Sequence, residues 1–172
     1  GDLTDPNSAT TAPAVLKEMD LVIRNSSRTH SLRMDATPPD AWGERFVLMG
    51  QFKRKVLSTH AGRFADWSGK TYAFFPKIDL AEIRSAVEAD WTGDLGQLQG
   101  QGTLRFWADL DKGQWQSAMA DVSLVGLQAR LSAQGLPLAF ERLSGRFGVQ
   151  VHKEGFFAHT QGLSFVNDEG LQ

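Results

Sequence analysis

The sequence contains no cysteine. This absence excludes disulfide frameworks, thiolate zinc sites and cysteine nucleophiles, because each of them requires a thiol. It does not decide the compartment, since proteins without disulfides occur in the cytoplasm and in the periplasm alike. No apolar run approaches the roughly 18–20 residues that cross a bilayer. A signal peptide and an initial methionine are also missing. We therefore expect a section from the interior of a longer protein, with any membrane anchor outside it.

An excess of charge of one sign is missing too. The chain has 18 basic and 20 acidic residues and a net charge of −2. No global field therefore attracts nucleic acid, and we expect no nucleic-acid partner. The basic run Lys53-Arg54-Lys55 is short, and we expect it to be the solvated end of a strand. The 41% of hydrophobic residues and the length of 172 residues are ordinary for one folded domain or for part of an elongated one.

The sequence contains few residues whose spacing resembles a catalytic or metal-binding motif. The four histidines, which are His30, His60, His152 and His159, lie in different segments and have no zinc-ligand spacing. The nucleophile motif Gly-x-Ser-x-Gly is absent. The glycines of Gly93–Gly102 lack the lysine of a phosphate loop and are expected to permit bulges in a bent strand. Asp109 and Asp111 flank a turn, where aspartate is common. We expect no enzyme, no metal and no cofactor.

Alternation of apolar and polar residues is the strongest positive signal. It is clearest in Arg45–Lys53 and is repeated in Leu104–Leu110 and Arg146–His152. Alternate side chains of a strand lie on opposite faces of its sheet, so these segments predict a sheet with one apolar face. Arg45 and Arg105 fall on the opposite face, where we expect them to be solvated and tolerant of substitution.

The same pattern predicts strands along most of the chain. They are Leu16–Asn25, Thr29–Thr37, Arg45–Lys53, Lys70–Phe75, Leu98–Leu110, Trp115–Leu124, Leu127–Ala133, Leu138–Phe140, Gly145–His152 and Phe156–Phe165. Turn residues at Asn25-Ser26-Ser27, Asp111–Gln114 and Lys153–Gly155 predict hairpins. The fold class is therefore mainly β: an extended, twisted antiparallel sheet, groove-like and built from meander hairpins.

One short helix accompanies the predicted sheet. Apolar residues at three- and four-residue spacing predict it at Asp79–Ala89, with Asp79 as its cap and Glu82 completing a capping box. Residues 1–13 are expected to be a disordered leader, and residues 14–172 a single β-rich section of a larger protein.

The apolar face of such a sheet must be covered. A second sheet, the helix or a bound apolar ligand could cover it, and the residues by themselves favour a closed core. The same pattern is also compatible with a face that stays open to an apolar ligand.

Several short motifs, in order, resemble the YhdP family of AsmA-like envelope proteins. They are Leu32–Pro39, Trp42-Gly43 with Phe46, Phe64–Tyr72 with its Asp-Trp-Ser-Gly step, Ile78-Asp79-Leu80, Gly100–Leu110 and Leu143–Gly148 with its Leu-Ser-Gly-Arg opening. The resemblance spans about Leu16–Phe165, nearly the whole chain.

This resemblance implies a section of a periplasmic protein that is anchored in the inner membrane of a Gram-negative bacterium. Such proteins are similar to bridge-like lipid transfer proteins, whose β-groove shields phospholipid acyl chains between the two membranes and supports the outer-membrane permeability barrier. The implied partners are phospholipid acyl chains, adjoining sections of the same chain and, through an anchor elsewhere, a membrane. The alternative is a structural or protein-binding β-domain with a closed core, acting as a spacer or docking module.

Strand parity selects the side chains that would face lipid. They are Leu21, Ile23, Leu32, Met34, Phe46, Leu48, Phe52, Leu104, Phe106, Leu110, Phe147, Val149 and Val151. These thirteen residues are the candidate site.

Overall fold

The computed structural model describes residues 15–54, 66–88, 97–130 and 136–167. Within them lie eight strands and one helix: β1 (Lys17–Asn25), β2 (Thr29–Thr37), β3 (Phe46–Arg54), β4 (Trp67–Asp79), α1 (Leu80–Glu88), β5 (Gln97–Asp111), β6 (Gln114–Arg130), β7 (Leu138–His152) and β8 (Gly155–Asn167). The mainly β fold class predicted from alternation is confirmed. The predicted leader, His60 and Gly96 lie outside the described residues.

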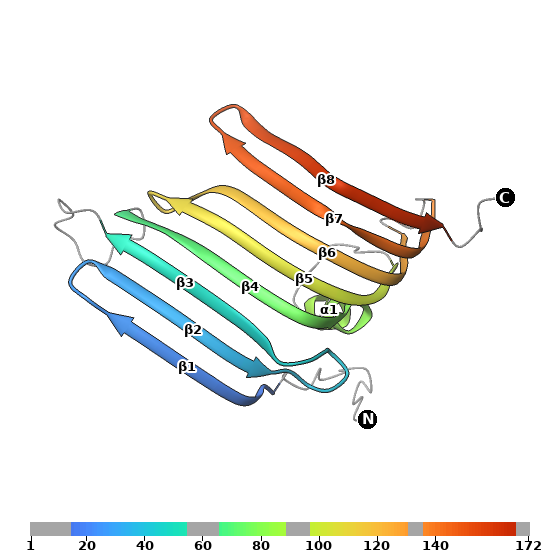
Figure 1. The fold of residues 1–172 in the computed structure, drawn as a ribbon, viewed down its shortest axis with the longest axis horizontal. Helices are drawn as coiled ribbons and strands as arrows, with labels where there is room; N and C mark the ends of the chain where they lie inside the picture. Colours follow the sequence, from blue (N-terminus) through green and yellow to red (C-terminus); the bar gives the residue numbers. More distant parts are fainter. Residues whose placement is uncertain (1–14, 55–65, 89–96, 131–135, 168–172) are drawn as a thin grey trace, which may run out of the picture.

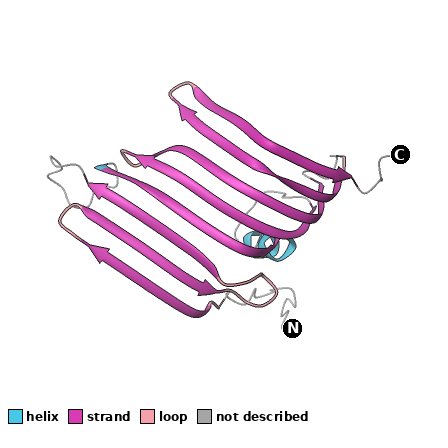
Figure 2. Cartoon of the chain, in the orientation of Figure 1, coloured by secondary structure: helices cyan, strands magenta, loops and turns pink. Residues whose placement is uncertain are grey.

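The eight strands form one meander sheet in which spatial order follows chain order (Figure 1). Every neighbouring pair is antiparallel. The sheet is open: among the described residues, β1 and β8 each have a strand on one side only. Figure 2 shows α1 at one end of the sheet and no second layer of strands against it. The helix α1 therefore covers a small part of one face of the sheet.

Three predicted strand boundaries are wrong, because strands continue through bulges. Trp115–Leu124 and the described part of the predicted strand Leu127–Ala133 belong to one strand, β6, which pairs with its neighbours on both sides of Gly126. Leu138–Phe140 and Gly145–His152 are likewise parts of β7. The third, β4, extends beyond Phe75 because Pro76 lies at a register shift, where its missing N–H removes no ladder bond.

The helix begins where the sequence predicts. The Asp79 carboxylate accepts hydrogen bonds from the backbone N–H groups of Ala81 (3.0 Å) and Glu82 (3.4 Å), as an N-cap does. The predicted capping box is wrong in its second half, because the Asp79 N–H donates to the carbonyl of Trp42 (3.0 Å) and not to Glu82. This bond fixes the loop between β2 and β3 against the start of α1.

The helix packs against one end of the sheet, beside β4 and β5 (Figure 1). Its Leu80 and Ile83 contact a small buried cluster formed by Ile78, Leu124 and Leu127. No large side chain of the described residues is fully buried. The molecule therefore holds a small local core under the helix and leaves the rest of the sheet without a second layer.

Close approach of β5 and β6 generates a prediction. A Cβ at Gly102 would lie 1.9 Å from the carbonyl oxygen of Ser123, which is a rigid backbone atom. Gly102→Ala should therefore lower the free energy of unfolding by about 3 kcal/mol, as overpacking does. Gly145→Ala is the matched control, since its nearest atom would lie 3.2 Å away, and it should cost less than about 1 kcal/mol. Equal losses in urea unfolding would show that this close approach is not a constraint.

Candidate functional site

Cross-strand pairing sets which side chains share a face, because directly paired residues of an antiparallel sheet project on the same side. One row crosses the whole sheet and consists of Leu21, Met34, Leu48, Ala73, Phe106, Ala120, Phe147 and Thr160. We call the face that carries Leu48 the apolar face. Seven of these eight positions are apolar, so the row forms a nearly unbroken hydrophobic path at right angles to the strands.

The register brings all thirteen predicted residues to the apolar face. They are Leu21, Ile23, Leu32, Met34, Phe46, Leu48, Phe52, Leu104, Phe106, Leu110, Phe147, Val149 and Val151. With eight strands about 4.8 Å apart, the seven intervals of a row span about 34 Å. One leaflet of a bilayer contributes about half of its 30 Å hydrocarbon core. A row is therefore about twice the length of one extended acyl chain.

Exposure varies along the apolar face. Phe46 is 8% exposed and Leu110 is 4% exposed, so these two predicted residues belong to the interior and offer little surface to a ligand. Ile23 on β1 is 58% exposed. Phe156 on β8, which is not among the thirteen predicted residues, is 75% exposed. Several side chains near the centre of the face are thus buried among their neighbours, while those of the lateral strands are open to solvent.

A cavity of about 400 Å³ adjoins the apolar face beside α1. Its wall is almost entirely apolar: Leu16, Pro38, Trp42, Phe46, Phe75, Ile78, Ile83 and Leu104, with Glu44 and Lys77 as its charged members. Phe46 and Phe75 stack with ring centroids 5.2 Å apart. The loop that carries Trp42 is fixed by the backbone bond from Glu44 N–H to the Lys77 carbonyl (3.3 Å). The cavity therefore has the mainly apolar lining, with few polar groups, that is typical of ligand sites.

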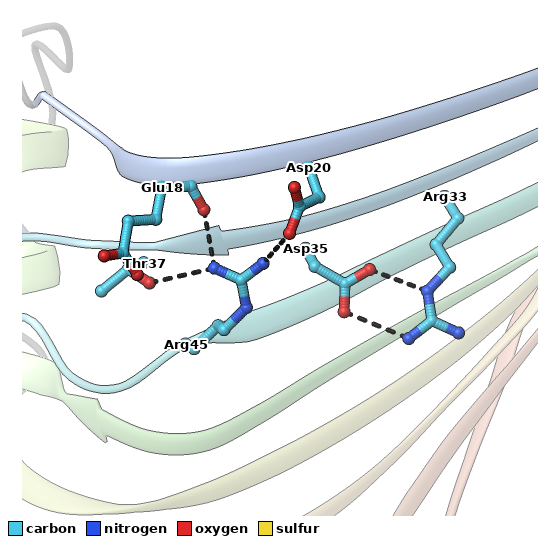
Figure 3. Close-up of polar contacts among 6 residues, drawn as sticks. All are labelled: Glu18, Asp20, Arg33, Asp35, Thr37 and Arg45. Atoms are coloured by element: carbon cyan, nitrogen blue, oxygen red, sulfur yellow. Dashed lines mark hydrogen bonds and ion pairs between the residues drawn. The ribbon is translucent and has the colours of Figure 1, made fainter.

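The opposite face carries most of the charged groups of the sheet, and we call it the polar face. Figure 3 shows Arg45 donating to the Glu18 carbonyl (2.6 Å), to the Thr37 hydroxyl (3.3 Å) and to the Asp20 carboxylate. These bonds join β1, β2 and the start of β3. The sequence did not predict these partners of Arg45, whose side chain is partly exposed. Its tolerance of substitution stays a prediction. Arg105 is exposed as expected, and its guanidinium carbon lies 4.8 Å from the Phe74 ring centroid.

Two further ion pairs lie on the polar face, and each shifts the titration of its aspartate. Arg33 binds Asp35 through Nε (2.7 Å) and Nη2 (3.1 Å), as Figure 3 shows. Arg146 binds Asp121 through two bonds, of which the second is 2.8 Å long. Hydrogen bonding to the arginine lowers the pKa of Asp35 and of Asp121 below the ordinary aspartate value. Both carboxylates are therefore charged at neutral pH.

The polar face also contains an apolar stripe, which the prediction from alternation did not include. Val22, Met49, Tyr72, Trp107 and Met119 follow one another across β1, β3, β4, β5 and β6, in a row that also contains Arg33 on β2. The sequence contained a signal for this stripe: Trp107 follows Phe106 directly and so lies on the opposite face, and Tyr72 precedes Ala73 in the same way. The prediction passed over both residues because the longer alternating runs selected the other face.

Within the described residues, the other candidate groups make separate local contacts. His30 contacts Asn25 Oδ1 through Nδ1 (2.9 Å) and lies against Trp67, while His159 stacks on Phe157. The hydroxyl of Ser117 donates to Asp109 (3.0 Å). Among the described ranges, no group of three or more metal-ligating side chains comes together.

The part of the chain that the structure describes contains no helix with the length and apolarity required to cross a membrane.

A family model described as YhdP protein matches residues 4–172. No curated protein and no solved structure matches the chain.

The Arg146–Asp121 pair generates a pH prediction. Because folding lowers the pKa of Asp121, the pair stabilises the fold above the pKa of the unfolded carboxyl group, and this stabilisation is lost as the pH falls through the folded pKa. Asp121→Asn should therefore lower the midpoint of thermal unfolding at pH 7. Its difference from the parent chain should disappear in strong acid.

Melts followed by circular dichroism between pH 2 and pH 7 would measure this gap. Asp40→Asn is the control, because the Asp40 side chain is 89% exposed in its pair with Lys17 and its removal should change little at any pH. A gap for Asp121→Asn that is the same at every pH would contradict the assignment.

Proposed function

Because this chain belongs to the YhdP family, we propose that it is a section of a periplasm-spanning β-groove that carries phospholipid acyl chains between the inner and outer membranes. Proteins of this family are Gram-negative envelope proteins, and the family is one of lipid transport that is not known for enzymes. The proposal places the chain in the periplasm as part of a protein anchored in the inner membrane. Its role there is to support the permeability barrier of the outer membrane.

One observation carries the proposal: apolar side chains occupy nearly every position of a row that runs across all eight strands and ends on open strands. A chain lying along this row would contact Leu21, Leu48, Phe106 and Phe147 in succession. Removing apolar area from water contributes about 25 cal/mol per Å², without directional demands, so acyl chains can slide from one contact to the next. The same open strands permit the path to continue onto adjoining sections.

The alternative of a spacer with a closed core has less support. Such a core would bury several large side chains completely, and among the described residues none is fully buried. Leu32 on β2 is 40% exposed although both of its neighbouring strands are present. An apolar side chain that is open to solvent inside a sheet is better explained by a transient apolar ligand than by a finished core.

Photo-crosslinking tests which face meets lipid. A photoreactive residue at Ile23 or Leu48, on the apolar face, should give phospholipid adducts in the full-length protein. The same residue at Val22 or Met49 should give none above background, because these positions lie on the polar face. Ile23 and Val22 are the matched pair, since they are neighbours in sequence and are 58% and 47% exposed. Equal lipid adducts within each pair would refute the proposal.

Charge substitution tests whether the path is used. Ile23→Glu places a carboxylate beside the passing acyl chains, where an unpaired charge costs several kcal/mol, so phospholipid transfer should fall about tenfold or more. Val22→Glu is the control and should transfer at nearly the parental rate, because the carboxylate then points to the other side. Both positions are exposed, so thermal melts of the two variants should agree. Equal transfer by the two variants would show that this face is not the path.

A further inference from the structure

The polar face contains a second hollow that acyl transport does not use. Its volume is about 550 Å³, and it lies over β1 to β5. The side chains that line it from the polar face are Val22, Arg24, Ser31, Arg33, Met49, Gln51, Lys70, Tyr72 and Trp107. An acyl chain on the opposite face is separated from this hollow by the sheet itself. Its composition therefore needs an explanation of its own.

The floor of the hollow is aromatic and apolar. Tyr72 and Trp107 are direct cross-strand partners, and their ring centroids lie 5.7 Å apart. Met49 pairs with Tyr72 on the other side and is 42% exposed, and Val22 at the far end is 47% exposed. Trp, Tyr, Met and Arg are the residue types that are enriched in the buried centres of protein interfaces. The floor has the composition of such a centre.

The rim of the hollow is positively charged. Arg24, Arg33 and Lys70 line it, and no aspartate or glutamate does, in a chain whose net charge is −2. Arg33 is neutralised by Asp35. The side chains of Arg24 and Lys70 form no ion pair or hydrogen bond with any residue in the described ranges. Asp109 is the cross-strand partner of Lys70, but its carboxylate accepts a hydrogen bond from the hydroxyl of Ser117 instead. Arg24 and Lys70 belong to one cross-strand row, which runs beside the row that carries Met49, Tyr72 and Trp107. Two cations without an acidic partner therefore lie along one side of the aromatic floor.

We propose that this hollow docks an acidic amphipathic helix of a partner protein. The backbone groups of an interior sheet face are already paired, so an occupant must satisfy its own backbone hydrogen bonds, as a helix does. The row from β1 to β5 spans four strand intervals, about 19 Å, which corresponds to about 13 helical residues. Apolar side chains of this helix would rest on Met49, Tyr72 and Trp107, while its carboxylates would meet Arg24 and Lys70.

The test is photo-crosslinking of the full-length protein in its own cells, with the photoreactive residue at Met49. A protein adduct is expected, and sequencing of the crosslinked peptide should find an acidic segment with apolar residues at helical spacing. A combined Arg24→Glu and Lys70→Glu variant should reduce the adduct about tenfold or more, because it sets like charges against each other. Lys53→Glu reverses an exposed charge of the same face outside the hollow, and it should leave the yield unchanged.

Other outcomes overturn the docking site. Lipid or glycan adducts in place of protein would assign the hollow to another ligand, and the absence of any adduct would leave it without an occupant. A basic or non-helical crosslinked segment, or a yield that survives the double charge reversal in a variant with parental melting behaviour, would also refute it. Crosslinking at Leu48 in parallel reports on the opposite face, so the failure of one proposal is distinguishable from the failure of the other.

Discussion

The pairing register of the antiparallel ladder is the constraint on which the rest of this structure depends. A slip of one residue in any strand would move its whole set of apolar side chains to the other face. The path of Leu48, Phe106 and Phe147 exists because the register is kept from β2 through β7, and irregularities are confined to bulges. Gly102 has no room for a side chain at one of these close approaches. The strands are irregular at Pro76 and Gly126, yet the side chains of the path stay on the same face.

The two faces of the sheet differ chemically. On the apolar face, one short helix covers one end, so the exposed apolar area of β1, β7 and β8 is not hidden by a second layer. On the polar face, Arg45 and Arg146 join neighbouring strands through charge-assisted bonds, which are stronger than neutral ones. The stability of an open sheet of this kind comes from the ladder and from these cross-strand contacts more than from a central core. A surface that must hold and release an apolar chain is compatible with such an arrangement.

The proposed lipid path and the proposed docking surface lie on opposite faces of one sheet, so they do not compete for space. Trp107 on the polar face and Phe106 on the apolar face are adjacent in sequence, and each belongs to a row that crosses the sheet. A partner bound over Trp107 would leave the apolar row free. The sheet can therefore join a transport path to a neighbouring protein without closing the path.

The sequence by itself determined the antiparallel sheet, the helix with its Asp79 cap, the hairpin turns and the face of all thirteen predicted side chains, because alternation and turn chemistry are local properties. Only the tertiary structure decided that Phe46 and Leu110 are buried while Ile23 is open, since exposure depends on which strands and which helix lie alongside. It also decided that Arg45 joins three segments, and that Met49, Tyr72 and Trp107 meet across separate strands. Such contacts depend on the register between distant parts of the chain, which no local pattern contains.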